Sequence, residues 1–202
     1  MNLDLFAPES EPGEWLDIRG GRLFWAPHFF QANEANQYFS VLRQTLDWQQ
    51  EAITLYGKSV LQPRLQCWCG EAQYTYSGLT MQPNPWTPVL LAIKAACERV
   101  AQSRFNSVLA NLYRDGQDSM GWHQDNEPEL GPAPVIASVS LGETRRFLLK
   151  HGKTSEKIEF QLGHGSLLIM AGDTQSNWIH SIPKTQQRCN ERMNLTYRWI
   201  QE

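Results

Sequence analysis

The chain has 202 residues and a formal net charge of −3. These values fit one large globular domain and exclude a strongly basic surface for binding polyanions, so any contact with nucleic acid would rest on local basic patches. The acidic N-terminal stretch MNLDLFAPESEPGEW lacks the apolar run of a signal peptide, and no segment has the roughly 18 consecutive apolar residues of a membrane span.

The first half of the chain predicts strands interrupted by two helices. Residues 15–27 predict a hairpin that turns at Gly20-Gly21. Apolar residues at helical spacing predict helices over about residues 31–48 and 86–101, the second of which begins after prolines. Between them, residues 51–81 are strand-like and aromatic, with glycines as breaks.

From about residue 106 onward the sequence predicts short strands only. Turn signals separate them at intervals of roughly 8–12 residues, which is typical of a sandwich or jelly roll. We therefore predict an α+β protein in which an N-terminal region, residues 1–105, packs on a jelly-roll core, residues 106–202, within one compact domain. The four cysteines show no disulfide framework and are predicted to be free thiols in the cytoplasm, or in the nucleus of a eukaryotic source.

The stretch WHQDNEPEL contains a histidine, an aspartate and a glutamate at alternate positions. In an extended chain His123 and Asp125 share a face, and Glu127 keeps that phase because it precedes a proline. His180 follows 55 residues after Asp125, in the strand-like NWIHSIP. Two imidazoles and one carboxylate are the protein ligands of a facial triad for non-heme Fe(II). The alternative interpretation is a set of surface groups and a core histidine satisfied by a hydrogen bond.

The stretch from Arg192 to Trp199 alternates between polar and apolar residues without error. Its polar face carries Arg192, Asn194, Thr196 and Arg198. One interpretation is a half-exposed strand with its polar face outside. If the polar face instead lies inside a barrel, the two arginines need an anionic partner, and a dicarboxylate such as 2-oxoglutarate would supply it.

These motifs, taken together and in order, resemble the AlkB family of Fe(II)- and 2-oxoglutarate-dependent oxygenases, which remove alkyl groups from nucleic-acid bases. The resemblance covers about residues 50–200. The matching motifs are Asn111-Leu-Tyr113, His123-x-Asp125-x-Glu127, His180 and Arg192-x₅-Arg198. For the fold it implies a double-stranded β-helix core, with N-terminal helices and a nucleotide-recognition lid.

The resemblance also implies how the cofactor and cosubstrate are held. The implied iron ligands are His123, Asp125 and His180. The implied contacts to the distal carboxylate of 2-oxoglutarate are Arg192, Tyr113 and Asn194. The implied groups around its proximal carboxylate are Arg198 and Asn111. O₂ is the second cosubstrate. Taken alone, Asn111 could equally cap a strand end, and Tyr113 could be a core aromatic residue.

A base pocket is implied by Tyr74-Thr-Tyr76-Ser-Gly, which resembles the stretch that lines this pocket in the nucleic-acid branch of the family. An enzyme that acts on a base within a duplex must flip that base out of the stack. The resemblance implies that Tyr76 stacks on the base opposite His123, and that Tyr74 hydrogen-bonds the base or backbone. Glu127 would face the exocyclic amine of the base and favour a positively charged lesion. The alternative for the two tyrosines is strand packing.

Two further residues resemble contacts made by relatives that act on duplexes. Tyr56, in Leu55-Tyr56-Gly57-Lys58, would be a wedge that fills the gap left by a flipped base, or else a surface tyrosine in a tight turn. Arg64 would contact a phosphate or the base pocket. A basic cluster could also touch phosphate, although we expect most of it to be a solvated strand face. Its members are Arg145, Arg146, Lys150, Lys153 and Lys157.

The implied function is the oxidative demethylation of N1-methyladenine and N3-methylcytosine in DNA, with release of formaldehyde and succinate. The expected partner is alkylated DNA, with RNA left open, and we expect a monomer that contacts no membrane. The alternatives are an RNA demethylase, a hydroxylase of proteins or small molecules, and a non-catalytic jelly-roll binding module. The intact set of motif residues argues against the last of these.

The wedge role predicts a selective defect. Replacing Tyr56 by alanine should slow demethylation of duplex substrates more than that of single strands, because only a duplex leaves a gap to fill. Rates on matched single-stranded and duplex oligonucleotides measure the difference. An equal loss on both substrates would contradict the wedge role.

Overall fold

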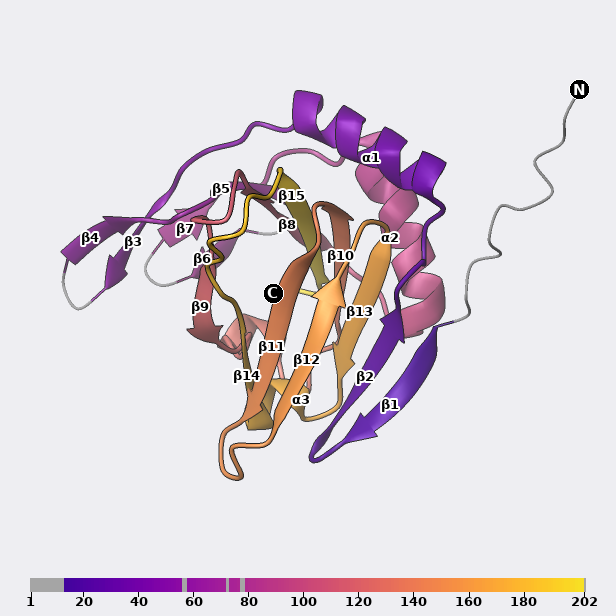
Figure 1. Cartoon of the computed structure of the whole chain (residues 1–202), viewed down its shortest axis with the longest axis vertical. Helices are drawn as coiled ribbons and strands as arrows, with labels where there is room; N and C mark the ends of the chain where they lie inside the picture. Colours follow the sequence, from indigo (N-terminus) through magenta and orange to yellow (C-terminus); the bar gives the residue numbers. More distant parts are fainter. Residues whose placement is uncertain (1–12, 56–57, 72, 77–78, 202) are drawn as a thin grey trace, which may run out of the picture.

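The computed structural model of the chain describes residues 13–55, 58–71, 73–76 and 79–201. Its elements form three layers, in which two helices cover one face of a seven-stranded antiparallel sheet and a four-stranded sheet packs on the other face (Figure 1). Two face-to-face antiparallel sheets are the architecture of a jelly roll, so the predicted fold class is confirmed.

Strands of the two sheets, two separate hairpins and the helices are mixed along the chain. Up to residue 101 they are β1 (Glu14–Ile18), β2 (Gly21–Ala26), α1 (Ala32–Thr45), β3 (Ala52–Leu55), β4 (Lys58–Leu61), β5 (Leu65–Gly70), β6 (Tyr74–Tyr76), β7 (Leu79–Met81) and α2 (Pro88–Ala101). The strands that follow are β8 (Ser107–Tyr113), β9 (Met120–His123), β10 (Ile136–Gly142), β11 (Arg145–His151), β12 (Lys157–Leu162), β13 (Ser166–Ala171), β14 (Trp178–Ile182) and β15 (Arg192–Arg198). Two short helices lie among them, η1 (Pro128–Leu130) and α3 (Thr174–Asn177).

Both predicted helices are present, and the first hairpin is displaced only at its turn. Thr87 caps α2, since its hydroxyl accepts a hydrogen bond from the backbone N–H of Leu90 at 3.2 Å. In the hairpin, Ile18 pairs with Gly21, so the two-residue turn is Arg19-Gly20 rather than the predicted Gly20-Gly21. Gly20 takes the positive φ of 61° that such a turn requires.

The larger sheet has the order β1-β2-β13-β10-β15-β8-β5, and the smaller one β12-β11-β14-β9. Strands β1, β2 and β5 precede residue 105, yet they belong to the same sheet as the strands that follow it. The region 1–105 and the region 106–202 therefore share one sheet. The hairpins β3–β4 and β6–β7 lie beside the end of the sandwich that carries β9 (Figure 1).

Strand alternation sorts side chains between two cores. Odd-numbered residues of β15, such as Leu195, pack with α1 and α2, and its even-numbered residues face the smaller sheet. The core between the sheets includes Phe147 and Leu149 from β11 and Trp178 from β14. With one face under helices and the other under a second sheet, every residue of β8 and of β15 is buried.

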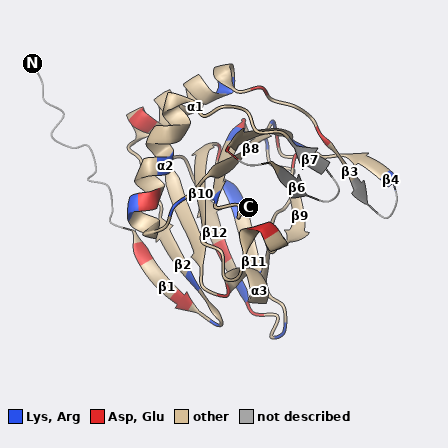
Figure 2. Cartoon of the chain, turned by 180° about the vertical axis from the view of Figure 1, so that it is seen from behind, with Lys and Arg blue, Asp and Glu red and all other residues tan. Residues whose placement is uncertain are grey.

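Charges are interspersed on the ribbon rather than gathered on one face (Figure 2). All four cysteines are free thiols, as predicted. Among the described helices, none has the length and apolar character needed to cross a membrane.

Helix α2 offers a matched test of the packing. Leu90 is fully buried under the larger sheet, whereas its neighbour Leu91 is 46% exposed. Leu90→Ala should lower the free energy of unfolding by about 3 kcal/mol, and Leu91→Ala by less than about 0.5 kcal/mol. Urea denaturation of the two variants measures both values. Similar losses would contradict the assigned helix face.

Candidate active site

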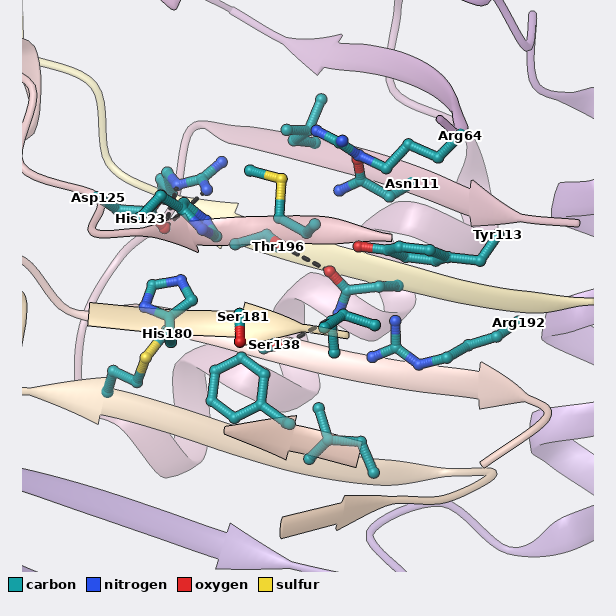
Figure 3. A pocket seen from close by; sticks show the side chains of 18 residues that line it. Arg64, Asn111, Tyr113, His123, Asp125, Ser138, His180, Ser181, Arg192 and Thr196 are labelled. Carbon is teal, nitrogen blue, oxygen red and sulfur yellow. Dashed lines mark hydrogen bonds and ion pairs between the residues drawn. The ribbon is translucent and has the colours of Figure 1, made fainter. Parts of the chain in front are cut away.

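The pairing of β9 with β14 brings two of the predicted ligands together. His123 lies opposite His180 in this antiparallel pair, and their ring centroids are 4.2 Å apart. Asp125 follows β9 by two residues, and the ligand atoms of the three side chains all lie within 4.8 Å of one another. A register shift between the pairs His180–His123 and Ile182–Met120 lets both Met120 and His123 face the same cavity. The predicted grouping of two histidines and one aspartate is therefore present (Figure 3).

Both imidazoles are held in the form that binds a metal. The Nδ1–H of His123 donates to the carbonyl of Gly121 at 2.9 Å, which leaves its Nε2 lone pair directed towards Asp125. Burial lowers the pKa of His123. Burial, reinforced by the neighbouring His123, lowers the pKa of His180 to about 3. At neutral pH both rings are uncharged, so each offers a free nitrogen lone pair.

The carboxylate of Asp125 divides its two oxygens between two neighbours. Its Oδ2 accepts hydrogen bonds from Arg198 Nη2 at 2.7 Å and Nε at 3.3 Å, and its Oδ1 lies 3.8 Å from His123 Nε2. Burial by itself would raise the pKa of Asp125, but Arg198 and the two histidines hold it well below its ordinary value. One oxygen of an ionised carboxylate therefore faces the two imidazoles. This donor set fits non-heme Fe(II).

A buried glutamine from α3 fixes the backbone of Asp125. Its N–H donates to the side-chain carbonyl of Gln175 at 2.9 Å, and the amide of Gln175 lies 3.3 Å from the sulfur of Met170. Gln175, in α3, is 1% exposed. The hydrogen bond from the Asp125 backbone to the buried amide of Gln175 sets where the Asp125 carboxylate points. Sequence reasoning did not identify Gln175.

The polar face of β15 lies inside the protein, as one of the two sequence interpretations required. Arg192, Asn194, Thr196 and Arg198 are all buried and line a cavity between the two sheets. The cavity has the three ligand residues at one end and Arg192 with Tyr113 at the other, with Thr196 and Ser138 between them (Figure 3). The half-exposed strand is therefore excluded.

Arg192 carries a buried charge without a carboxylate partner. It lies opposite Tyr113 in the β8–β15 pair, with its guanidinium carbon 5.1 Å from the centroid of that ring. Its Nη2 donates to Ser140 Oγ at 2.9 Å, but Nε and Nη1 have no hydrogen-bond partner among the described residues. Burial, the largest cause, lowers the pKa of Arg192 to about 10, so it remains charged at neutral pH. A buried cation with free donors is a site for an anion.

Asn111 and Arg64 form the cavity wall between these ends. Arg64 is 2% exposed, and its Nε donates to Asn111 Oδ1 at 2.7 Å. Its Nη2 donates to Gln62 Oε1 at 2.7 Å, while Gln66 Nε2 also donates to Asn111 Oδ1, at 3.2 Å. Arg64 thus lies in the wall of the cavity and not at an exposed phosphate site.

The predicted base-pocket residues are placed less completely. Tyr56 lies outside the described residues, and for Tyr74 and Tyr76 the structure describes the strand β6 but not the side chains. Glu127 precedes η1 and is not among the residues that line the cavity. Its Oε2 is nevertheless buried and has no hydrogen-bond partner among the described residues. An unpaired buried carboxylate oxygen is an acceptor that a ligand donor could satisfy.

Two serines on β10 contact the polar face of β15 and were also missed, and one of them, Ser138, lines the cavity. Ser138 Oγ accepts from Asn194 Nδ2 at 2.8 Å, and Ser140 binds Arg192. The alternation in IASVSLG, with serines two residues apart, was the signal that could have identified them. It matches the alternation of β15, which pairs with β10.

Comparisons with known proteins agree with this geometry. A family model described as the 2OG-Fe(II) oxygenase superfamily matches residues 22–198. The chain is 41% identical to the bovine protein named alpha-ketoglutarate-dependent dioxygenase alkB homolog 3, over 89% of this chain and 66% of that protein. It is 41% identical to the mouse protein named DNA oxidative demethylase ALKBH2, over 85% of this chain and 77% of that protein. The chain therefore spans slightly less than two thirds of the length of the first of these relatives.

A solved structure shares the fold at low sequence identity. The structure described as OsALKBH1 superposes with a TM-score of 0.63 and 16% identity, covering 92% of this chain and 100% of that one. This likeness supports the jelly-roll architecture alone.

The contact between Gln175 and Asp125 predicts a metal-binding defect. Gln175→Met keeps the length of the side chain but removes the acceptor for the backbone N–H of Asp125, and should weaken Mn(II) binding about tenfold. Calorimetric titration with Mn(II) measures it. The control is Gln161→Met, at an exposed position of β12. Unchanged affinity in Gln175→Met would contradict the positioning role.

Proposed function

Because the chain belongs to the AlkB family of 2-oxoglutarate- and Fe(II)-dependent oxygenases, we propose that it is an oxidative demethylase of N-alkylated bases in DNA. One observation carries the proposal. The His-Asp-His cluster and the free donors of Arg192 face opposite ends of the same buried cavity. A metal and an anion are therefore accommodated side by side, as the chemistry of this family requires.

The metal would be held by His123, Asp125 and His180. Iron bound there would supply the oxidation of the N-alkyl carbon. One oxygen atom of O₂ would go into succinate as 2-oxoglutarate loses CO₂, the other would go onto the alkyl carbon, and a methyl group would then leave the base as formaldehyde. The protein's contribution is to keep both imidazoles neutral and Asp125 ionised. Arg198 prevents Asp125 Oδ2 from turning, so that Oδ1 stays beside His123.

The cosubstrate would lie along the polar face of β15. The guanidinium of Arg192 offers Nε and Nη1 to the distal carboxylate, and Tyr113 lines the same end of the cavity. Arg198, which contacts Asp125, and Asn111, which lies opposite Asn194 in the β8–β15 pair, would bind around the proximal carboxylate. The apolar lining from Leu109 and Phe147 excludes water from the space between the two ends.

The substrate assignment rests on Glu127 and β6. N1-methyladenine and N3-methylcytosine carry a positive ring charge and an exocyclic amine, and the unpaired Oε2 of Glu127 provides a complementary acceptor. Tyr76 would stack on an extruded base, and Tyr74 would hydrogen-bond the base or backbone. The name of the mouse relative, DNA oxidative demethylase ALKBH2, supports a DNA substrate. We propose alkylated DNA as the partner of a monomeric enzyme.

The experiment that tests the function follows a defined lesion. The protein is incubated with Fe(II), 2-oxoglutarate, ascorbate and an oligonucleotide carrying one N3-methylcytosine, and products are measured by mass spectrometry. We expect conversion to cytosine that requires both iron and 2-oxoglutarate. Parallel DNA and RNA oligonucleotides, single-stranded and duplexed, identify the preferred substrate. Consumption of 2-oxoglutarate without repair would indicate a different substrate, and no consumption despite bound iron would favour a binding module.

A substitution at the metal centre checks the assignment of ligands. Asp125→Ala removes one of the three ligands and should lower turnover to background while leaving the circular dichroism spectrum unchanged. Asp17→Ala is the control, since the Asp17 side chain is 91% exposed on β1. Retained turnover in Asp125→Ala would contradict the iron assignment.

A further inference from the structure

Arg145 departs from the solvated basic cluster in which the sequence placed it. It is the first residue of β11 and is only 4% exposed. The next residue, Arg146, has the exposed position expected for the cluster and pairs with Glu159 at 2.9 Å. The two neighbouring arginines therefore differ in environment, and only the second belongs to a solvated strand face.

The guanidinium of Arg145 is hydrogen-bonded but not neutralised. Its Nη1 donates to the carbonyl of Asp115 at 3.1 Å, and its Nη2 donates to the carbonyls of Asp118 at 3.0 Å and Pro183 at 2.7 Å. No carboxylate pairs with it among the described residues. The side chain thus ties the β8–β9 connection to the segment after β14, and it leaves a full positive charge inside the protein.

This charge lies beside the anion-binding end of the cavity. The guanidinium carbon of Arg145 is 5.8 Å from the centroid of the Tyr113 ring, and that of Arg192 is 5.1 Å from the same centroid. Arg192 comes from the larger sheet and Arg145 from the smaller one, so two cations approach one aromatic ring from different sheets. After burial, the positive charge of Arg145 is a further cause of the lowered pKa of Arg192.

We infer that Arg145 is a positioning and electrostatic residue for the dicarboxylate cosubstrate, acting through Tyr113 and Arg192 to favour a dianion over a monoanion. This inference rests on the proposed function, which supplies the cosubstrate. Arg192 lines this end of the cavity, and Arg145 lies outside it, against the Tyr113 ring that forms part of the lining. Both charges favour a carboxylate at this end over an apolar chain end. The hydrogen bonds to three backbone carbonyls fix the guanidinium of Arg145 in its position beside the Tyr113 ring.

The test compares two 2-oxo acids of equal chain length. One is 2-oxoglutarate and the other is 2-oxopentanoate, which has a methyl group in place of the distal carboxylate. Both are titrated calorimetrically into Mn(II)-loaded protein without O₂, so the readout is binding and not turnover. Arg145→Gln should weaken 2-oxoglutarate binding about fivefold to tenfold and leave 2-oxopentanoate binding within about twofold. Arg146→Gln, the matched control, should change neither affinity.

Other outcomes of the titrations would contradict either the role of Arg145 or the proposed function. An unchanged ratio of the two affinities in Arg145→Gln overturns the inference. If both affinities fall equally, the role of Arg145 is merely structural, and if neither falls, Arg145 does not affect binding. A wild-type protein that binds neither acid would contradict the proposed function instead. If Arg145→Gln does not fold, Arg145→Lys is used instead, because lysine keeps the positive charge but lacks the planar guanidinium and its several donors. Its ratio should stay within about threefold of wild type, and a larger fall overturns the electrostatic part.

Discussion

The burial of both faces of β15 is the constraint on which the rest of the structure depends. A strand covered on one side by helices and on the other by a second sheet exposes neither its apolar nor its polar row to water. The apolar row satisfies this condition by packing against α1 and α2. The polar row can be buried only where neighbouring residues supply hydrogen bonds and opposite charges, because burying an isolated charge costs more free energy than packing its side chain contributes. The cavity lining follows from this requirement.

The neighbours do not balance the charge. Three arginines and one aspartate line the cavity, and its two histidines are neutral at neutral pH. Arg198 pairs with Asp125, and Arg64 donates hydrogen bonds to the side-chain amide oxygens of Gln62 and Asn111. Arg192, in contrast, has donors without a hydrogen-bond partner among the described residues. Replacing these cations with apolar residues would make a more ordinary core. Their retention is consistent with an anionic ligand that completes the balance when it binds.

Local patterns in the sequence predicted the features that depend on periodicity and residue type. The two helices, the strand sequence, the grouping of His123, Asp125 and His180 and the alternation of β15 are of this kind, and all are present in the structure. The roles of these three residues as iron ligands stay predictions. Gln175 and Arg145 were missed because their roles arise from contacts with Asp125 and Tyr113, which are distant in the chain and come close only through register. The sequence even favoured the wrong environment for Arg145, because four other basic residues follow it within the next 12 positions and suggest a solvated strand face. The roles of Tyr56, Tyr74, Tyr76 and Glu127 stay predictions.

The position of β15 also has a consequence for the order of assembly. It is the last described strand of the chain, yet it lies in the interior of the larger sheet, between β10 and β8. Before β15 is synthesised, that sheet has a gap at its middle and Asp125 lacks Arg198. Other contacts are equally remote, such as the hydrogen bond from the Trp178 indole to the Arg19 carbonyl, and folds dominated by remote contacts close late and slowly. A nascent chain that lacks β15 has neither Arg192 nor Arg198, so the cavity that His123, Asp125 and His180 share with Arg192 is complete only after the last strand has paired.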